Sequence, residues 1–159
     1  MFLIRKTTLE RVEAIVETMP PGALKNIHKD KRFDKFDWRK EAGFNVFQLK
    51  LKDSGVCLGL MSVEDIPAEW RIEIRLIEVS RENIGHEKEY ERIAGCLIAF
   101  ACQMAFNKKY RGFVSLIPKT VLIEHYKNTY GFEQLGRHLT LDFPASSLLV
   151  KKYILDEIE

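Results

Sequence analysis

The chain has 159 residues, of which 46% are hydrophobic and 30% are charged, and its formal net charge is +2. This length supports one sizeable hydrophobic core, so we expect a single domain over residues 1–159. Acidic and basic residues are interspersed, which argues against proteins that bind nucleic acid or a membrane surface through charge, and we expect neither as a partner. The apolar run at the N-terminus is too short for a signal peptide, so we expect a cytoplasmic location.

The N-terminal region predicts one helix and one charged segment. In residues 8–17, apolar residues recur at positions 9, 12, 15 and 16 and two prolines follow, which is typical of an amphipathic helix. Residues 26–40 are charged but contain Phe33, Phe36 and Trp38. We interpret this segment as a solvated helix or loop that its aromatic side chains hold against the core; the alternative is a substrate lid.

Strands dominate the next part of the chain. Residues 45–51 alternate cleanly, residues 52–55 form a turn and residues 56–63 return as a strand, which predicts a hairpin. In residues 72–79 the apolar side chains occupy positions 72, 74 and 76 and then 77 and 79. This change of face predicts a β-bulge, which would leave backbone groups unpaired beside a helix N-terminus and open a surface for a ligand with amides and phosphates.

Two helices and a strand follow the proposed bulge. The segment 92–106 is apolar nearly all round, which predicts a buried helix that is too short to span a bilayer. Residues 113–117 predict a buried strand, and residues 121–130 predict a helix that Gly131 closes. Residues 145–158 can form a C-terminal helix. The three cysteines, Cys57, Cys96 and Cys102, are expected to be reduced core residues.

Two short motifs resemble those of the GNAT N-acyltransferase superfamily. The segment Arg92-Ile93-Ala94-Gly95-Cys96-Leu97 resembles the family's acyl-CoA pyrophosphate motif, and His125 to Glu133 resembles its late helix, which usually ends in Tyr-x-x-x-Gly-Phe. The resemblance covers about residues 43 to 142. It implies an α+β fold with a GNAT-like central mixed β-sheet, a bulged fourth strand and flanking helices. The residues expected at the cofactor are Ile77, Val79, Arg92, Ile93, Ala94, Gly95, Cys96 and Leu97.

Acyl transfer to an amine requires a base for the amine and an acid for the leaving thiolate. Glu73 and Glu78 flank the proposed bulge and are the candidate bases, with Glu78 preferred because it lies nearer the bend. The alternative is that both are surface charges paired with nearby arginines. Tyr126 is the candidate acid, although it stands five residues before Gly131 where the family has four; the alternative is a packing role, with Tyr130 as the substitute acid.

Three functions stay open at this point. The first, which the resemblance implies, is an acetyl-CoA-dependent N-acetyltransferase that transfers an acyl group directly to an amine in a ternary complex. Acetyl-CoA would be the co-substrate and a small-molecule or protein amine the acceptor. The alternatives are a catalytically inactive CoA-binding or regulatory domain and a protein-interaction component such as a toxin-type partner. We expect a monomer or a homodimer, and no metal site, because the four histidines fall on different predicted elements.

Overall fold

The structure is a computed structural model that describes residues 1–118 and 122–156 of the chain. It divides into two compact units. The first unit contains Met1–Ser62 and Leu76–Leu97, and the second contains Val63–Arg75 and the chain from Ile98 onward. Each unit is described separately below.

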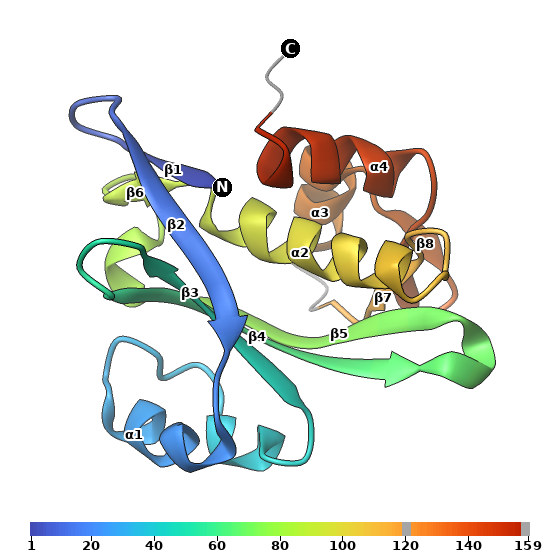
Figure 1. The fold of residues 1–159 in the computed structure, drawn as a ribbon, viewed down its shortest axis with the longest axis horizontal. Helices are drawn as coiled ribbons and strands as arrows, with labels where there is room; N and C mark the ends of the chain where they lie inside the picture. The colour runs from blue at the N-terminus through green and yellow to red at the C-terminus, as the bar shows by residue number, and fades with distance from the viewer. Residues whose placement is uncertain (119–121, 157–159) are drawn as a thin grey trace. The chain divides into compact units, whose positions relative to one another are not determined.

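The first unit opens with a β-hairpin where the sequence predicted a helix. Strand β1 (Phe2–Arg5) pairs antiparallel with β2 (Arg11–Thr18), and β2 pairs antiparallel with β3 (Asn45–Leu51) (Figure 1). The predicted helix over residues 8–17 is therefore wrong. β2 is rich in β-branched residues, and a strand with partners on both sides gains backbone hydrogen bonds that outweigh its local helical spacing.

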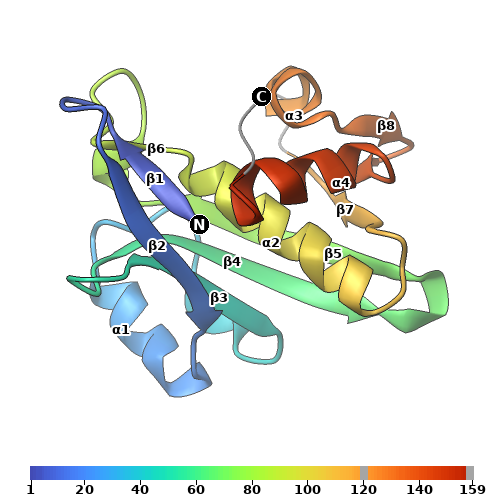
Figure 2. The ribbon, with the colours of Figure 1, turned by 45° about the horizontal axis from the view of Figure 1, so that its top comes forward.

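The charged segment of the first unit is held by a small apolar cluster. Helix α1 (Leu24–Lys29) and the turn η2 (Trp38–Glu41) lie beside the ends of β2 and β3 in both ribbon views (Figure 1, Figure 2). Phe33 and Trp38 are buried in this cluster and Phe36 packs against it. The prediction that aromatic side chains hold this segment against the core is confirmed.

The remaining elements of the first unit lead to the buried helix. They are the first part of β4 (Cys57–Ile66), the second part of β5 (Arg71–Val79), the turn η4 (Arg81–Asn83), β6 (Tyr90–Glu91) and the start of α2 (Ile93–Asn107). The hairpin prediction for β3 and β4 and the helix prediction for α2 are confirmed. No helix among the described residues is long and apolar enough to cross a membrane.

The second unit is a mixed sheet with helices. The first part of β5 pairs in parallel with β7 (Val114–Leu116), β7 pairs antiparallel with β9 (His138–Leu141), and β9 pairs antiparallel with β8 (Glu133–Leu135). Helix α3 (Ile123–Tyr130) precedes β8, and α4 (Ala145–Leu149) continues into a π-helical turn, Val150–Ile154. The residues predicted as helical at 121 and at 157–158 lie outside the described residues.

The hydrogen-bonded strand order is β6-β1-β2-β3-β4-β5-β7-β9-β8, and β4 and β5 run through both units. The parallel pairing of β5 with β7 beside antiparallel pairs confirms the α+β class with a mixed sheet. Burial along β5 differs from the predicted pattern: Ile72, Ile74 and Glu78 are buried, whereas Ile77 and Val79 are only half-buried. The hydropathy pattern predicted that Ile77 and Val79 would be buried, but the acidic side chain of Glu78 between them is buried instead. The bulge itself stays a prediction.

Candidate active site

The start of α2 packs closely on β4 in the first unit. A Cβ added to Gly59 would lie 2.8 Å from Ile93 Cγ2 and 3.0 Å from Leu97 Cδ1. A side chain at this position would push these two side chains away, so glycine allows the close approach of strand and helix. The backbone N–H of Cys96 donates to the carbonyl of Arg92, and the N–H groups of the residues before Cys96 have no partner within the helix. These N–H groups and the helix dipole suit an anionic ligand.

The connection from β5 to α2 is ordered by one amide side chain. Asn83 is buried; its Nδ2 donates to Ser80 Oγ at 2.8 Å and its Oδ1 accepts from the N–H of Tyr90 at 2.8 Å. Tyr90 and Glu91 then pair with β1. The amide of Asn83 therefore closes the connection over residues 80–92 and leads the chain to the helix start, while Gly85 stays exposed with φ of 84°.

Arg92 precedes α2 in a left-handed conformation, with φ of 86°. Its Nε donates to the carbonyl of Phe2 at 3.0 Å, and its guanidinium lies 4.0 Å from the centre of the Phe2 ring. The guanidinium of Arg11 lies 4.4 Å from the same ring. Among the predicted cofactor residues, Ala94 is half-buried and Ile93, Gly95, Cys96 and Leu97 are buried. A phosphate would therefore be contacted mainly by backbone N–H groups, because the guanidinium of Arg92 is already bound to Phe2 of β1.

Glu78, the preferred base from the sequence, is bound by groups of the charged segment. It is 3% exposed, and its carboxylate accepts hydrogen bonds from Trp38 Nε1 at 2.8 Å and from the backbone N–H of Lys35 at 3.1 Å. The two bonds use different carboxylate oxygens. These contacts are those of a structural anchor for residues 35–38, and a catalytic role for Glu78 stays a prediction.

We expect Glu78→Leu to lower the free energy of unfolding by about 1–3 kcal/mol, because the indole N–H of Trp38 would be left buried without an acceptor. Glu78→Gln keeps an acceptor oxygen and should cost less. Urea unfolding of the two variants measures the difference. Equal stability of Glu78→Leu and wild type would contradict the anchoring role, and a folded Glu78→Gln variant without turnover would instead support Glu78 as the base.

Glu73 belongs to a polar cluster in the second unit. Its Oε1 lies 3.0 Å from His138 Nε2 and 3.1 Å from Arg71 Nη1, and the same Arg71 nitrogen donates to Ser115 Oγ at 2.7 Å. The side chains of Glu73 and Arg71 are 16% exposed and that of His138 is 33% exposed. A histidine that a carboxylate holds through one ring nitrogen has the other nitrogen available as a proton acceptor, and the remaining exposure leaves room for a substrate.

The sequence did not point to His138, because 65 residues separate it from Glu73. The sheet register brings them together: Glu73 pairs with Ser115 across β5 and β7, and Ser115 pairs with Thr140 across β7 and β9. His138 stands two residues from Thr140, so its side chain lies on the same face of β9. The alternation of His138 and Thr140 with the buried Leu139 and Leu141 is the one available signal that this strand has a polar face.

Tyr126, the predicted acid, is half-buried among aromatic rings of α3 and the loop after it. Its ring centre lies 5.6 Å from that of Phe132 and 6.0 Å from that of Tyr130. Burial raises the pKa of Tyr126 above its ordinary value, so the phenol stays protonated at neutral pH. Its hydroxyl makes no hydrogen bond with the described residues, which leaves it available to a ligand.

α3 is regular to its end. It remains α-helical through Tyr130, and the N–H of Gly131, in the left-handed conformation, donates to the carbonyl of Lys127 at 3.1 Å. The extra residue between Tyr126 and Gly131 is therefore not absorbed by a loosened last turn, and the direction of Tyr126 is set by a regular helix.

The cysteines are free, and the two on α2 are buried. Burial raises the pKa of Cys57 to about 11 and that of Cys102 to about 12, so both thiols stay protonated at neutral pH. A protonated thiol is a poor nucleophile, in agreement with the predicted core role. Within residues 1–118 and 122–156, no group of three or more histidine, cysteine, aspartate or glutamate residues could hold a metal ion.

No protein-family model and no curated protein sequence matches this chain. Several solved structures are similar to it. Aminoglycoside acetyltransferase AAC(6')-Ib, in complex with coenzyme A and kanamycin, superposes with a TM-score of 0.62 at 11% identity, covering 86% of this chain and 98% of that one. A GNAT family acetyltransferase from Brucella melitensis, in complex with acetyl-CoA, gives a TM-score of 0.54 at 14% identity, covering 82% and 88%. The chain has the GNAT fold.

A third similar structure is a point mutant of the toxin AtaT, bound to the C-terminus of the antitoxin AtaR and to acetyl-CoA. It superposes with a TM-score of 0.57 at 12% identity, covering 86% of this chain and 97% of that one. Identities this low establish the GNAT fold and leave activity to be argued from the residues of this chain.

Proposed function

We propose that the chain is a cytoplasmic acetyl-CoA-dependent N-acetyltransferase that transfers an acyl group to a small-molecule or protein amine. The GNAT fold supports this proposal, because similar structures were solved with coenzyme A or acetyl-CoA bound. The free cysteines agree with a cytoplasmic location. The observation that carries the catalytic part is the contact of His138 with Glu73 on a partly exposed sheet face.

In this proposal, acetyl-CoA binds at the start of α2 through its pyrophosphate. The N–H groups of Ile93, Ala94 and Gly95 would donate to phosphate oxygens, and the positive end of the helix dipole would attract their charge. The first turn of α2 contains no acidic side chain that would repel an anion. Gly59 supports the site indirectly, because it allows the helix start to lie close against β4.

The chemistry needs two proton transfers. His138 accepts the proton of the attacking amine, directly or through a water, while Glu73 holds the imidazole by its Nε2 and stabilises the cation that forms. The amine nitrogen then bonds to the thioester carbonyl carbon, and the carbon–sulfur bond breaks. Tyr126 gives its phenolic proton to the leaving thiolate, and bulk solvent reprotonates the phenolate. Product release returns free CoA.

Acetyl-CoA is expected to stabilise the wild type by about 2.7 kcal/mol at one hundred times its dissociation constant, which corresponds to a rise in melting temperature of roughly 5–10 °C. Ala94→Asp should remove most of this shift, because its carboxylate would repel the pyrophosphate. The variant should fold well, since an acidic residue in the first turn favours a helix. Thermal unfolding with and without acetyl-CoA measures both effects.

Ala94→Asn is the matched control, because it has the same shape and no charge. It should keep most of the shift. Position 94 is better suited to this test than Gly95, which is buried and would not tolerate a side chain without a change in packing. If the Asp and Asn variants respond to acetyl-CoA as the wild type does, the assignment of the pyrophosphate to the start of α2 is wrong.

A further inference from the structure

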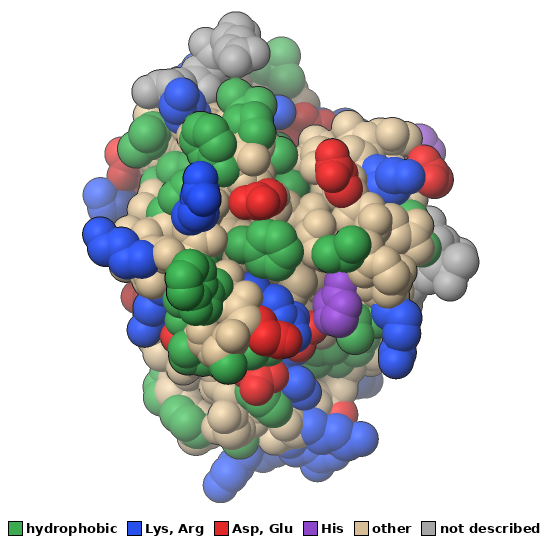
Figure 3. Space-filling model, turned by 90° about the vertical axis from the view of Figure 1, so that its right-hand side faces the viewer, with side chains coloured by type: hydrophobic (Ala, Val, Ile, Leu, Met, Phe, Trp, Pro, Cys, Tyr) green, Lys and Arg blue, Asp and Glu red, His purple; other side chains and the backbone are tan. Residues whose placement is uncertain are grey.

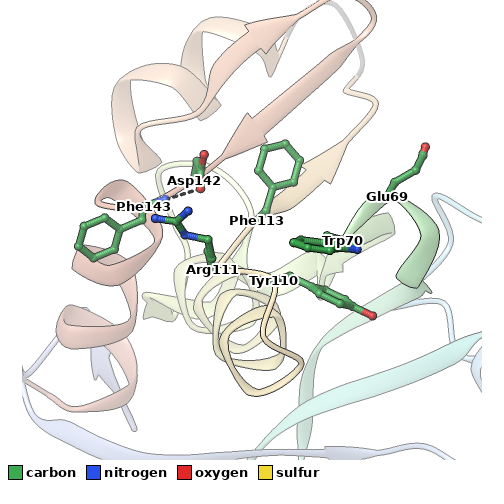
Figure 4. Close-up of a pocket in the computed structure, with 7 residues that line it drawn as sticks. All are labelled: Glu69, Trp70, Tyr110, Arg111, Phe113, Asp142 and Phe143. Atoms are coloured by element: carbon green, nitrogen blue, oxygen red, sulfur yellow. Dashed lines mark hydrogen bonds between the residues drawn. The ribbon is translucent and has the colours of Figure 1, made fainter.

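The second unit contains a pocket that the proposed transfer reaction does not use. It has a volume of about 350 Å³ and lies among the turn that joins β4 to β5, the loop between α2 and β7, and the connection from β9 to α4 (Figure 4). Trp70, Tyr110 and Phe113 contribute rings to one part of it, and Arg111 and Asp142 line the other part. The pocket therefore combines an aromatic surface with a charged end.

The aromatic part is exposed, and a hydrogen bond holds one of its rings. Trp70 is 67% exposed and lines the pocket together with Tyr110 and Phe113, and contiguous exposed apolar side chains often mark a binding surface. The Tyr110 hydroxyl donates to Asp65 at 2.6 Å, and the N–H of Phe113 donates to the carbonyl of Tyr110 at 3.0 Å. Figure 3, seen from the side of the β4–β5 turn, shows exposed hydrophobic side chains beside acidic and basic ones. The rings thus form an exposed apolar surface on which a flat ligand can stack.

The charged part of the pocket contains one cationic side chain, and it has no ion pair among the described residues. Glu69 accepts two hydrogen bonds from Arg71, at 2.8 and 3.1 Å, and its carboxylate points away from the rings (Figure 4). Asp142 accepts from the backbone N–H of Phe143 at 2.8 Å. Arg111 makes no ion pair or hydrogen bond through its side chain with the described residues. The cationic group available to a ligand is therefore the guanidinium of Arg111, which prefers a carboxylate or phosphate.

Two residues that line the pocket have a backbone conformation that favours glycine. Trp70 has φ of 51° and ψ of 49°, and Arg111 has φ of 57°. A side chain at such a position costs stability, and glycine would adopt the same conformation without this cost. Both residues nevertheless have a large exposed side chain in place of glycine, which agrees with a role of these side chains in binding.

We propose that this pocket binds a planar aromatic molecule that carries one anionic group. The ligand's ring would stack on Trp70 beside Tyr110 and Phe113, and its carboxylate or phosphate would pair with Arg111. This site is separate from the proposed transfer site, since its lining includes neither the start of α2 nor His138 and Glu73.

The test uses the full chain and a pair of probes that differ mainly in charge, 4-nitrobenzoate and 4-nitrobenzylammonium. Nitroaromatic rings quench tryptophan fluorescence on contact, and Trp70 is the exposed tryptophan whereas Trp38 is fully buried. We expect 4-nitrobenzoate to quench Trp70 with an affinity at least tenfold higher than that of the cation. Trp70→Phe should remove the quenching, and Trp38→Phe should keep it.

Arg111→Gln should weaken binding of 4-nitrobenzoate by about ten- to a hundredfold, the range for a lost hydrogen bond to a charged group. Arg111→Gly removes the same guanidinium and suits the left-handed backbone, so it should fold at least as stably as the wild type and still lose the anion. Arg137→Gln, at another exposed arginine of the second unit, is the control and should bind normally. Equal affinity for the two probes, unchanged binding by Arg111→Gly, or no saturable quenching would overturn the proposal.

Discussion

Tyr126→Phe is expected to lower kcat for acetyl transfer by about one hundred- to ten thousandfold, the range for loss of a general acid. The ring of Tyr126 packs against Tyr130 and Phe132, and burial raises the pKa of its phenol, so the proposed acid carries its proton at neutral pH. Because phenylalanine preserves the ring contacts, acetyl-CoA affinity should stay nearly unchanged. Steady-state kinetics with an amine panel and thermal unfolding with acetyl-CoA measure the two quantities.

Tyr130→Phe is the matched control, because Tyr130 lies one helical turn away and is buried next to the Tyr126 ring. It should change kcat by less than about tenfold, well below the loss expected for a general acid. If Tyr130 is essential and Tyr126 dispensable, the mechanism still holds but Tyr130, one helical turn away, is the general acid. If neither variant loses turnover, both tyrosines have packing roles and the thiolate is protonated by solvent or another group.

The parts of the fold that the sequence predicted correctly are those in which one local pattern dominates. α2 is apolar nearly all round, the β3–β4 hairpin alternates with period two, and Gly131 closes α3 in the left-handed conformation. In each of these, the hydrophobic period or the terminal glycine agrees with the packing of the folded chain. The order of these elements was enough to point to the GNAT fold.

β2 shows where such patterns fail. Its apolar residues can be counted at helical spacing, yet Ala14 is buried and the strand is paired on both sides, with Phe2 to Ile4 of β1 and with Phe47 to Leu51 of β3. Pairing with two partners distant in sequence cannot be inferred from a short local window. The helix prediction for residues 8–17 rested on local spacing alone. In the folded chain these residues form a strand, because pairing with two neighbouring strands gives more backbone hydrogen bonds.

The candidate site also has one part that the sequence could predict and one part that it could not. The start of α2 could be predicted, because its residues are contiguous and the structure keeps them together at a helix N-terminus. Glu73 and Glu78 could be singled out as acidic residues in an apolar strand, but their partners, His138 and Trp38, come from distant strands and turns. Only the register of the sheet shows that one carboxylate meets an imidazole and the other an indole N–H.

His138→Ala is expected to lower kcat/KM for the amine by about one hundred- to ten thousandfold, because the imidazole held by Glu73 is the proposed proton acceptor. The affinity for acetyl-CoA should not change, since His138 lies outside the start of α2. Added imidazole should restore part of the activity of His138→Ala by entering the space that the side chain leaves. It should not restore activity to variants that keep the imidazole, such as Tyr126→Phe.

Glu73→Gln tests the positioning of that imidazole. Gln keeps the shape of the side chain and an acceptor oxygen, but it removes the charge that would stabilise the imidazolium, so kcat should fall by about tenfold or more while KM for acetyl-CoA stays constant. Arg71, which also donates to Ser115, still holds the side chain in place, so the variant should unfold at a temperature close to that of the wild type. Imidazole should not rescue Glu73→Gln, because His138 still fills its place. Full activity of both Glu73→Gln and His138→Ala in a working transferase would contradict this assignment and leave Glu78 as the acidic candidate for the base.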